Sequence, residues 1–325
     1  MNTEHRKEHK MKWISPYIEN GNWYKGNLHT HTHVSDGGFS MDYAVIGYQH
    51  MAKHDFVVIT DHNYLKKMNP EKAISFESLN EQYKEKKFTI IEGREESFAH
   101  HILGVGAKMI YGVDSVKKDE SDYTLEDYQH LIDCIRAEGG LVYMAHPHWR
   151  EFDHWSTEAI MKLKGIDGIE ILNGNRFSGP GNLATDVWDD VLSRGKTVWG
   201  VANDDCHSPA TFWVVWNTVC AKSNSKEDIM SALKQGSNYF GNGAEFGRIE
   251  VQDDTIIVEC SKRDVFQTCE KIFRFVGKDG ECLKLQCGKE YYAEYKAKGD
   301  ELYVRVELIL NNGMVAFTNP FYLVR

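Results

Sequence analysis

The most informative residues are histidines and carboxylates that follow short apolar runs. His29 and His31 lie two residues apart in NLHTHTHVSDG (27–37), and Asp36 follows them in a Ser-Asp-Gly-Gly turn. Residues two apart in an extended segment point to the same side, so both imidazoles can converge on one point. Imidazole nitrogens suit divalent first-row metals, and the Asp36 carboxylate can reach back to the same region. This segment alone is weak support for a metal site.

Four further segments repeat the pattern of an apolar strand that ends in histidine or acid. They are Asp61-His62 after VVIT, Glu92 to Glu96 with His100 and His101 in 89–106, His146 and His148 in 142–149, and Asp204, Asp205 and His207 in 200–208. Histidine costs free energy to bury unless it is hydrogen-bonded or ligated. Five strand ends of this kind therefore predict one metal-dependent active site.

Several neighbouring residues compete for the same place in this site. Adjacent strand residues face opposite ways, so at most one of His100 and His101 faces the metals. By itself, Asp61 has a plain structural interpretation as a helix cap, and His62 as a surface residue. The pattern also leaves open Glu92, Glu95 or Glu96 in the third segment and Asp204 or Asp205 in the fifth.

The elements that must position these residues alternate between strand and helix. The predicted buried strands are 56–60, 88–91, 141–146, 168–172 and 198–202, and residues 125–138 and 183–194 have helical spacing. Repeated alternation predicts a mainly parallel sheet or a βα barrel, with the chemistry at the carboxyl ends of its strands. After about Gly247, alternating strands separated by DD, KDG, KGD and NNG turns predict hairpins. We therefore expect a hydrolase domain at 1–246 and an antiparallel β-sandwich domain at 247–325.

Composition narrows the function and the partners. The 325-residue chain carries a net charge of −10 without a basic block, which disfavours binding to a nucleic-acid backbone but allows a small anionic substrate. The polar start lacks the apolar stretch of a signal peptide, and no apolar run approaches a membrane span. Seven scattered cysteines predict reduced thiols and a cytoplasmic protein. The oligomeric state stays open.

Taken together, the motifs resemble those of the PHP (polymerase and histidinol phosphatase) family. The resemblance covers about residues 26–210 and rests on His29-x-His31 with Ser35-Asp36-Gly37, Thr60-Asp61-His62, Ala145-His146-Pro147 and Asp205-x-His207. It implies a distorted seven-stranded βα barrel around two or three divalent metal ions, Zn, Mn or Fe. The β module after the barrel is similar to the carbaryl-hydrolase-like branch of the family.

The resemblance also implies a role for each ligand. Gly93-x-Glu95 matches the family's Gly-x-Glu, whose carboxylate bridges two metals, and His-Ile-Leu-Gly favours His101 over His100. The implied ligand sets are His29, His31, Glu95 and Asp205 for the first metal, Glu95, His101 and His146 for the second, and Asp36, His62 and His207 for the third. Asp-x-His spacing favours Asp205 over Asp204.

The expected reaction is hydrolysis of a phosphoester in a small phosphorylated metabolite or nucleotide by a metal-bridging hydroxide. We assign catalysis to Glu95, Asp205 and His207, with Asp205 as a possible proton acceptor. The candidates for substrate binding, beside the predicted ligands, are Arg94, His148 and Arg176. Two alternatives remain: a hydrolase of carbamates, esters or amides, and a metal-binding interaction module without turnover.

Overall fold

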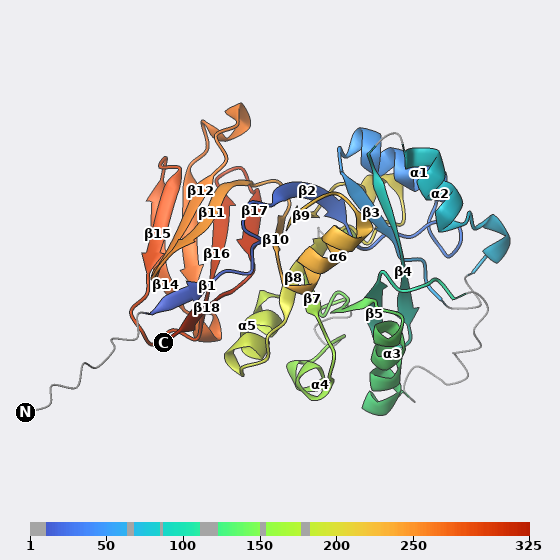
Figure 1. The fold of residues 1–325 in the computed structure, drawn as a ribbon, viewed down its shortest axis with the longest axis horizontal. Coiled ribbons are helices and arrows are strands. Elements are labelled where there is room, and N and C mark those ends of the chain that lie inside the picture. The colour runs from blue at the N-terminus through green and yellow to red at the C-terminus, as the bar shows by residue number, and fades with distance from the viewer. Residues whose placement is uncertain (1–10, 64–67, 85–86, 111–122, 150–153, 177–182) are drawn as a thin grey trace, which may run out of the picture. The chain divides into compact units, whose positions relative to one another are not determined.

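The computed structural model describes residues 11–63, 68–84, 87–110, 123–149, 154–176 and 183–325, without the side chain of Arg176 (Figure 1). The chain divides into two compact units. One is formed by Tyr17–Asn242, and the other combines the chain up to Pro16 with Gly243–Arg325. That these units correspond to the predicted domains at 1–246 and 247–325 stays a prediction.

The first unit is a mixed α/β structure. Its strands are β2 (Asn22–Asn27), β3 (Phe56–Ile59), β4 (Thr89–Ser97), β5 (His101–Val105), β6 (Leu141–Met144), β7 (Gly168–Asn173), β8 (Trp199–Asn203), β9 (Trp216–Ala221) and β10 (Asn238–Gly241). Its α-helices are α1 (Met41–Ile46), α2 (Phe76–Tyr83), α3 (Leu125–Ala137), α4 (Thr157–Lys162), α5 (Thr185–Ser193) and α6 (Lys226–Lys234). The shorter helical turns are η1 (Gly47–Met51), η3 (Pro70–Lys72), η6 (Gly174–Arg176) and η8 (Pro209–Thr211). The strands and helices predicted from the pattern are confirmed, with shifted ends.

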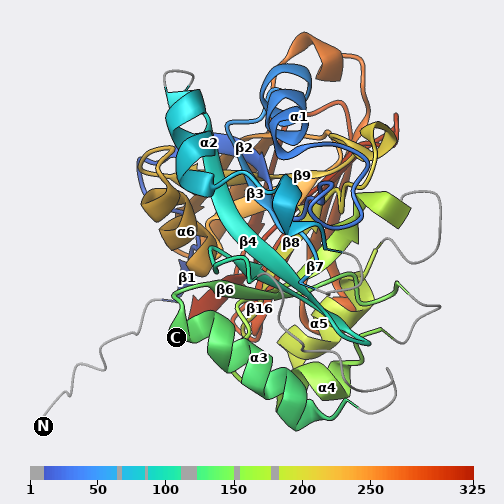
Figure 2. The same cartoon turned by 90° about the vertical axis from the view of Figure 1, so that its right-hand side faces the viewer.

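The strands follow one another around the sheet in the order β10-β9-β2-β3-β4-β5-β6-β7-β8. The pairs β2–β3, β3–β4, β6–β7 and β7–β8 are parallel, whereas β5 is antiparallel to both of its neighbours. Beyond the ends of β2 and β8, an isolated parallel bridge joins Thr30 and Cys206. Figure 2 shows α1 and α2 at one end of this unit and α3 and α4 at the other.

Strand β3 shows why these apolar runs form buried strands. All four of its residues are buried, and they alternate between two cores: Phe56 and Val58 pack in one, Val57 and Ile59 in the other. A strand covered on both faces requires such a continuous apolar run. At the neighbouring Gly26, a Cβ atom would lie 2.3 Å from the ring of Phe56, so only glycine fits there.

The second unit consists of antiparallel strands with tight turns. They are β1 (Lys12–Ile14), β11 (Phe246–Gln252), β12 (Thr255–Cys260), β13 (Lys271–Val276), β14 (Cys282–Gly288), β15 (Tyr292–Lys296), β16 (Tyr303–Leu310), β17 (Val315–Thr318) and β18 (Phe321–Val324), with the short turns η9 (Asp264–Phe266) and η10 (Lys278–Gly280). Strands β11, β12 and β15 form one sheet, and β1 pairs with β18, next to β16. The DD and KDG turns place Asp253 and Asp279 at positive φ, as tight hairpin turns require.

None of the helices in the described residues combines the length and apolar character needed to cross a membrane.

Candidate metal centre

The predicted ligands meet at one edge of the α/β unit. His29 and His31 follow β2, His62 follows β3, and Glu95 lies in β4, so consecutive strands deliver side chains to the same edge. All nine predicted ligands belong to groups of three or four residues whose ligand atoms lie within 4.8 Å of one another: His29, His31, Asp36, His62, Glu95, His101, His146, Asp205 and His207. The sequence pattern therefore identified residues that lie together in space.

Glu95 lies at the centre of this cluster. Its Oε1 atom is 3.4 Å from Nε2 of His29, 2.8 Å from Nδ1 of His101 and 3.2 Å from Nε2 of His146. Its Oε2 atom is 3.4 Å from Nε2 of His31. The same Oε2 atom lies 2.8 Å from Nδ1 of His62. One buried carboxylate thus faces imidazoles that come from four separate parts of the chain.

Two further carboxylates complete the cluster. Asp205 Oδ1 lies 3.3 Å from Nε2 of His29 and 3.2 Å from Nε2 of His31. Asp36 Oδ1 lies 3.3 Å from Nε2 of both His62 and His207. Each carboxylate therefore joins a different pair of imidazoles.

The residues fit divalent cations by two independent criteria. Nε2 of His29, both ring nitrogens of His31 and Nδ1 of His146 are buried and make no hydrogen bond to any described residue. Buried polar atoms are rarely left in that state, which points to a missing partner. Ligand atoms about 2.0–2.1 Å from a tetrahedral zinc ion lie about 3.3 Å apart. The separations of 3.2–3.4 Å around Asp205 match that value.

Electrostatics keep Glu95 and Asp205 ionised. Burial opposes the charge of Glu95, but the imidazoles of His101 and His29 outweigh it and hold the pKa well below its usual value. Asp205 behaves in the same way beside His29, so its pKa is also well below normal. Burial and the neighbouring imidazole of His207 lower the pKa of His31 well below its usual value. Ionised carboxylates and a neutral imidazole are the forms that bind metals.

A buried carboxylate that the sequence analysis missed supports this cluster. Glu170 Oε1 lies 3.0 Å from Nδ1 of His29, and its Oε2 accepts the backbone N–H of His146 at 2.9 Å. A carboxylate oxygen accepts, so Nδ1 of His29 donates a proton to Glu170 and Nε2 is the ring nitrogen directed at the site. The available signal was an acid inside the apolar run GIEIL.

Asp61 is a positioning residue for the first motif. Its Oδ1 accepts the backbone N–H of Thr32 at 2.6 Å and the hydroxyl of Ser35 at 2.6 Å, and its Oδ2 accepts the hydroxyl of Thr32 at 2.7 Å. These bonds hold the loop that carries His31 and Asp36. The helix-cap interpretation of Asp61 is therefore wrong.

The competing acids and histidines face elsewhere. Glu92 accepts the backbone N–H of Met109 at 2.7 Å, and Glu96 accepts from Arg94 at 2.5 Å. The side chain of Asp204 accepts hydrogen bonds from the hydroxyl of Tyr48 and from three backbone N–H groups, those of Trp213, Val214 and Val215. The ring of His100 lies 2.9 Å from the hydroxyl of Tyr128. These side chains stabilise the surroundings of the site rather than entering it.

Two of the three candidates for substrate binding have other partners. Arg94 is fully buried, and its guanidinium donates to Glu138 at 2.7 and 3.1 Å. We therefore assign Arg94 a structural role, because strand neighbours face opposite ways and Glu95 takes the inward position. Nε2 of His148 lies 2.8 Å from Oδ1 of Asp186. The side chain of Arg176 lies outside the described residues.

The cluster lines a small cavity of about 100 Å³. Besides the predicted ligands Asp36, His62, Glu95, His101, His146, Asp205 and His207, its walls contain Trp149 and Asn175. Trp155 is buried in the core, whereas Trp149 is part of the cavity wall.

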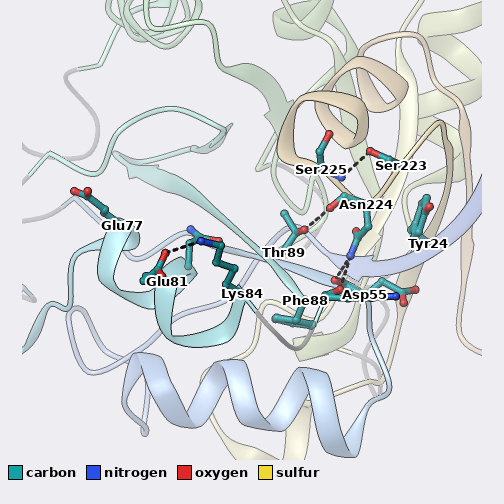
Figure 3. Close-up of a pocket in the computed structure, with 12 residues that line it drawn as sticks. Tyr24, Asp55, Glu77, Glu81, Lys84, Phe88, Thr89, Ser223, Asn224 and Ser225 are labelled. Atoms are coloured by element: carbon teal, nitrogen blue, oxygen red, sulfur yellow. Dashed lines mark hydrogen bonds and ion pairs between the residues drawn. The ribbon is translucent and has the colours of Figure 1, made fainter.

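A larger hollow of about 840 Å³ lies at the opposite ends of the strands (Figure 3). It is bordered by the starts of β3 and β4, the end of α2 and the turn before α6. Its polar groups bind one another: Lys84 pairs with Glu81 at 3.4 Å, and Asn224 donates to the backbone oxygen of Asp55 at 2.8 Å. No histidine is among the lining residues described, so the histidine and carboxylate cluster is not part of this hollow.

Comparison with known proteins supports the fold. No family model and no curated protein matches the sequence. Among solved structures, the chain is similar to a two-domain protein from Bacteroides vulgatus that contains a predicted PHP-like metal-dependent phosphoesterase. The identity is 15%, the TM-score is 0.56, and the match covers 95% of this chain and 98% of that one.

Two other solved structures are more distant. PsfC from Pseudomonas syringae has 13% identity and a TM-score of 0.41, with 65% of this chain and 87% of that one covered. The lesion-specific endonuclease PfuEndoQ from Pyrococcus furiosus has 15% identity and a TM-score of 0.45, with 67% and 57% covered. The chain has the fold of the Bacteroides protein, and the resemblance to the PHP family that its motifs indicate is confirmed at the level of the fold.

Proposed function

We propose that this chain is a metal-dependent hydrolase, and that it hydrolyses phosphoesters of a small phosphorylated metabolite or nucleotide. The observation that carries the proposal is Glu95, one ionised and buried carboxylate in contact with the imidazoles of His29, His101 and His146. A cluster of this kind has no use in a packed core, because each buried imidazole there would need its own hydrogen-bond partner.

The donor groups support two or three cations, Zn, Mn or Fe. We propose that Glu95 bridges the first two. The proposed sets are His29, His31, Glu95 and Asp205 for the first cation, Glu95, His101 and His146 for the second, and Asp36, His62 and His207 for the third. Each set overlaps with a group whose ligand atoms lie within 4.8 Å.

Divalent cations in such a site supply hydroxide near neutral pH and neutralise the charge that develops on phosphoryl oxygens. The carboxylate of Asp205 would accept the proton that the attacking water loses. Its Oδ1 faces His29 and His31, whereas its Oδ2 accepts from Asn173 at 3.3 Å and from Asn175 at 3.4 Å. These amides fix the orientation of the carboxylate, which would accept a proton from the reacting water.

We also propose that β2 to β8 close into the seven-stranded barrel implied by the family resemblance. The support is the Thr30–Cys206 bridge just beyond β2 and β8, together with the backbone bonds His31 N–H to Cys206 O at 3.0 Å and Gly38 N–H to His207 O at 2.7 Å. These contacts hold the first and last metal motifs against each other.

The test is a metal-reconstituted activity screen. Purified protein loaded with Zn²⁺, Mn²⁺ or Fe²⁺ is offered p-nitrophenyl phosphate, its diester and p-nitrophenyl acetate, which all release p-nitrophenol and represent the three kinds of bond to be compared. We expect more than one equivalent of metal per chain and turnover of a phosphoester. Turnover of the acetate alone would support the ester hydrolase, and bound metal without any turnover would support a binding module.

A matched pair of variants tests the bridge. Glu95→Gln should lose both bound metal and turnover, because the two cations would no longer share a negative charge. Glu96→Gln is the control, since Glu96 bonds to Arg94 on the other face of β4. Glu96→Gln should keep its metals. If Glu96→Gln empties the site and Glu95→Gln does not, the assignment of the bridge is wrong.

A further inference from the structure

Two side chains behind the cluster bind the backbone of one proposed ligand. The N–H of His101 donates to Nε2 of His154 at 2.9 Å, and its carbonyl oxygen accepts the indole N–H of Trp155 at 2.8 Å. Both side chains are only 2% exposed, and they come from the segment between β6 and α4. The backbone of Ala145 also donates to the carbonyl oxygen of His101, at 3.2 Å. The peptide groups of His101 are thus held from both sides.

The hydrogen bond to His154 fixes its chemical state. Nε2 accepts an N–H, so its lone pair is occupied and Nδ1 must carry the ring proton. Atoms of His101, His146 and His154 lie within 4.8 Å of one another, as in a three-histidine metal site. However, a ring with one nitrogen protonated and the other accepting has no lone pair left for a metal.

His101 needs such support because of its place in the chain. It is the first residue of β5, where strands commonly fray, and it pairs with Ser97 at the last position of the β4–β5 ladder. Its ring must nevertheless place Nδ1 2.8 Å from Oε1 of Glu95. The next residue upstream, His100, points instead to the hydroxyl of Tyr128.

We propose that His154 and Trp155 are positioning residues that clamp His101 so that its ring stays directed at the metal cluster. This inference rests on the proposed function. It predicts that the clamp tunes the affinity for metal without contributing a ligand. Partners of metal ligands beyond the first coordination shell typically change metal affinity or activity by about 10–100-fold.

Three variants separate the clamp from the alternatives. His154→Gln keeps an acceptor, because an amide oxygen of Gln replaces Nε2, whereas His154→Leu removes it. Trp155→Phe keeps the aromatic bulk and removes the indole N–H. The matched control is Trp188→Phe, since the indole N–H of Trp188 donates to the backbone oxygen of Val198 at 3.1 Å in an equally buried position of the same unit.

The measurements are the affinity for Zn²⁺ and Mn²⁺ by chelator competition, kcat, KM and Tm, on the full chain. We expect His154→Leu and Trp155→Phe to weaken the more loosely held metal by about 10–100-fold and to lower kcat more than they raise KM. His154→Gln should recover most of that affinity. Trp188→Phe should lower Tm without changing the affinity for metal.

Four results would overturn the clamp or the function, and they are distinguishable. If His154→Gln loses a full equivalent of metal as His154→Leu does, His154 is a ligand. If Trp155→Phe and His154→Leu lower only Tm, as Trp188→Phe does, the contacts are merely structural. If wild-type protein binds metal and turns over no substrate, the proposed function fails while the metal affinities still test the clamp. A wild type that binds no cation defeats both.

Discussion

Replacement of Glu170 by glutamine should separate the support of the metal ligands from the ligands themselves. Each carboxylate oxygen of Glu170 accepts two hydrogen bonds. Oε1 accepts from Nδ1 of His29 at 3.0 Å and from Asn203 at 2.9 Å, and Oε2 accepts from the N–H of His146 and from Asn173, both at 2.9 Å. Four donors converge on one buried carboxylate, so its replacement cannot be silent.

The expected magnitude follows from this count. Glutamine replaces one acceptor oxygen with a donor amide, so whichever way it turns, two donors lose their acceptor. A buried donor without a partner costs about 1–3 kcal/mol, which gives a loss of roughly 2–6 kcal/mol in the free energy of unfolding. At about 2 °C per kcal/mol, the Tm should fall by about 4 °C or more. If the amide faces His29, its ring orientation is lost and metal affinity should fall by about 10–100-fold.

Thermal unfolding with and without Zn²⁺, together with chelator competition, measures both effects. Glu158→Gln is the control, because Glu158 is an exposed acid on α4 that pairs with Arg194, and it should change neither quantity. Suppose that Glu170→Gln keeps wild-type affinity and Tm. The carboxylate then does not orient the ring of His29.

Three other outcomes follow from the same structure. Arg94→Met should lower the free energy of unfolding by on the order of 3 kcal/mol, because it leaves Glu96 and Glu138 without their buried cation, and it should not change KM. Burial raises the pKa of Asp55 above 3.8, so the wild type loses stability as the pH rises through the raised value. The difference between the Tm of Asp55→Asn and that of the wild type should therefore increase as the pH rises from below 3.8, and then level off. A difference that decreases over this range would contradict a raised pKa of Asp55. Removal of metal by a chelator should abolish turnover and lower Tm, and Zn²⁺ or Mn²⁺ should restore both, whereas a Tm that does not respond to metal would argue against the site.

The sequence predicted the proposed ligands because their positions obey a simple rule. Parallel strands end at one edge of a sheet, so histidines and acids after consecutive apolar runs must approach one another. The runs that end before Asp61-His62, His146 and Asp205 follow this rule directly. The sheet order confirms the parallel pairs on which it depends.

The choice among adjacent acids was harder, because the third strand is longer than its apolar run. The sequence predicts a strand at 88–91, whereas β4 extends through Ser97. The extension is stabilised by antiparallel pairing with β5, from Gly93–Val105 to Ser97–His101. Local composition cannot show that long-range pairing. The pairing nevertheless decides that Glu95 faces the cluster, while Arg94 and Glu96 lie on the opposite face of the strand. The substrate role predicted for Arg94 relied on proximity along the chain, which alternation in a strand makes misleading.

Two of the proposed ligands have backbone conformations that no pattern would have predicted. His146 has φ 28° and Asp205 has φ 47°, in the left-handed region where glycine or asparagine is usual. Each such residue costs on the order of 1–3 kcal/mol and persists only where its surroundings hold it. Here the backbone N–H of His146 binds Glu170, and the side chain of Asp205 accepts from Asn173. Glycine would relieve the strain at either position and remove the ligand atom, so the strained residue is retained where its side chain is needed. Local preference and structure disagree at these two positions because the cluster, rather than the turn, determines which residue stands there.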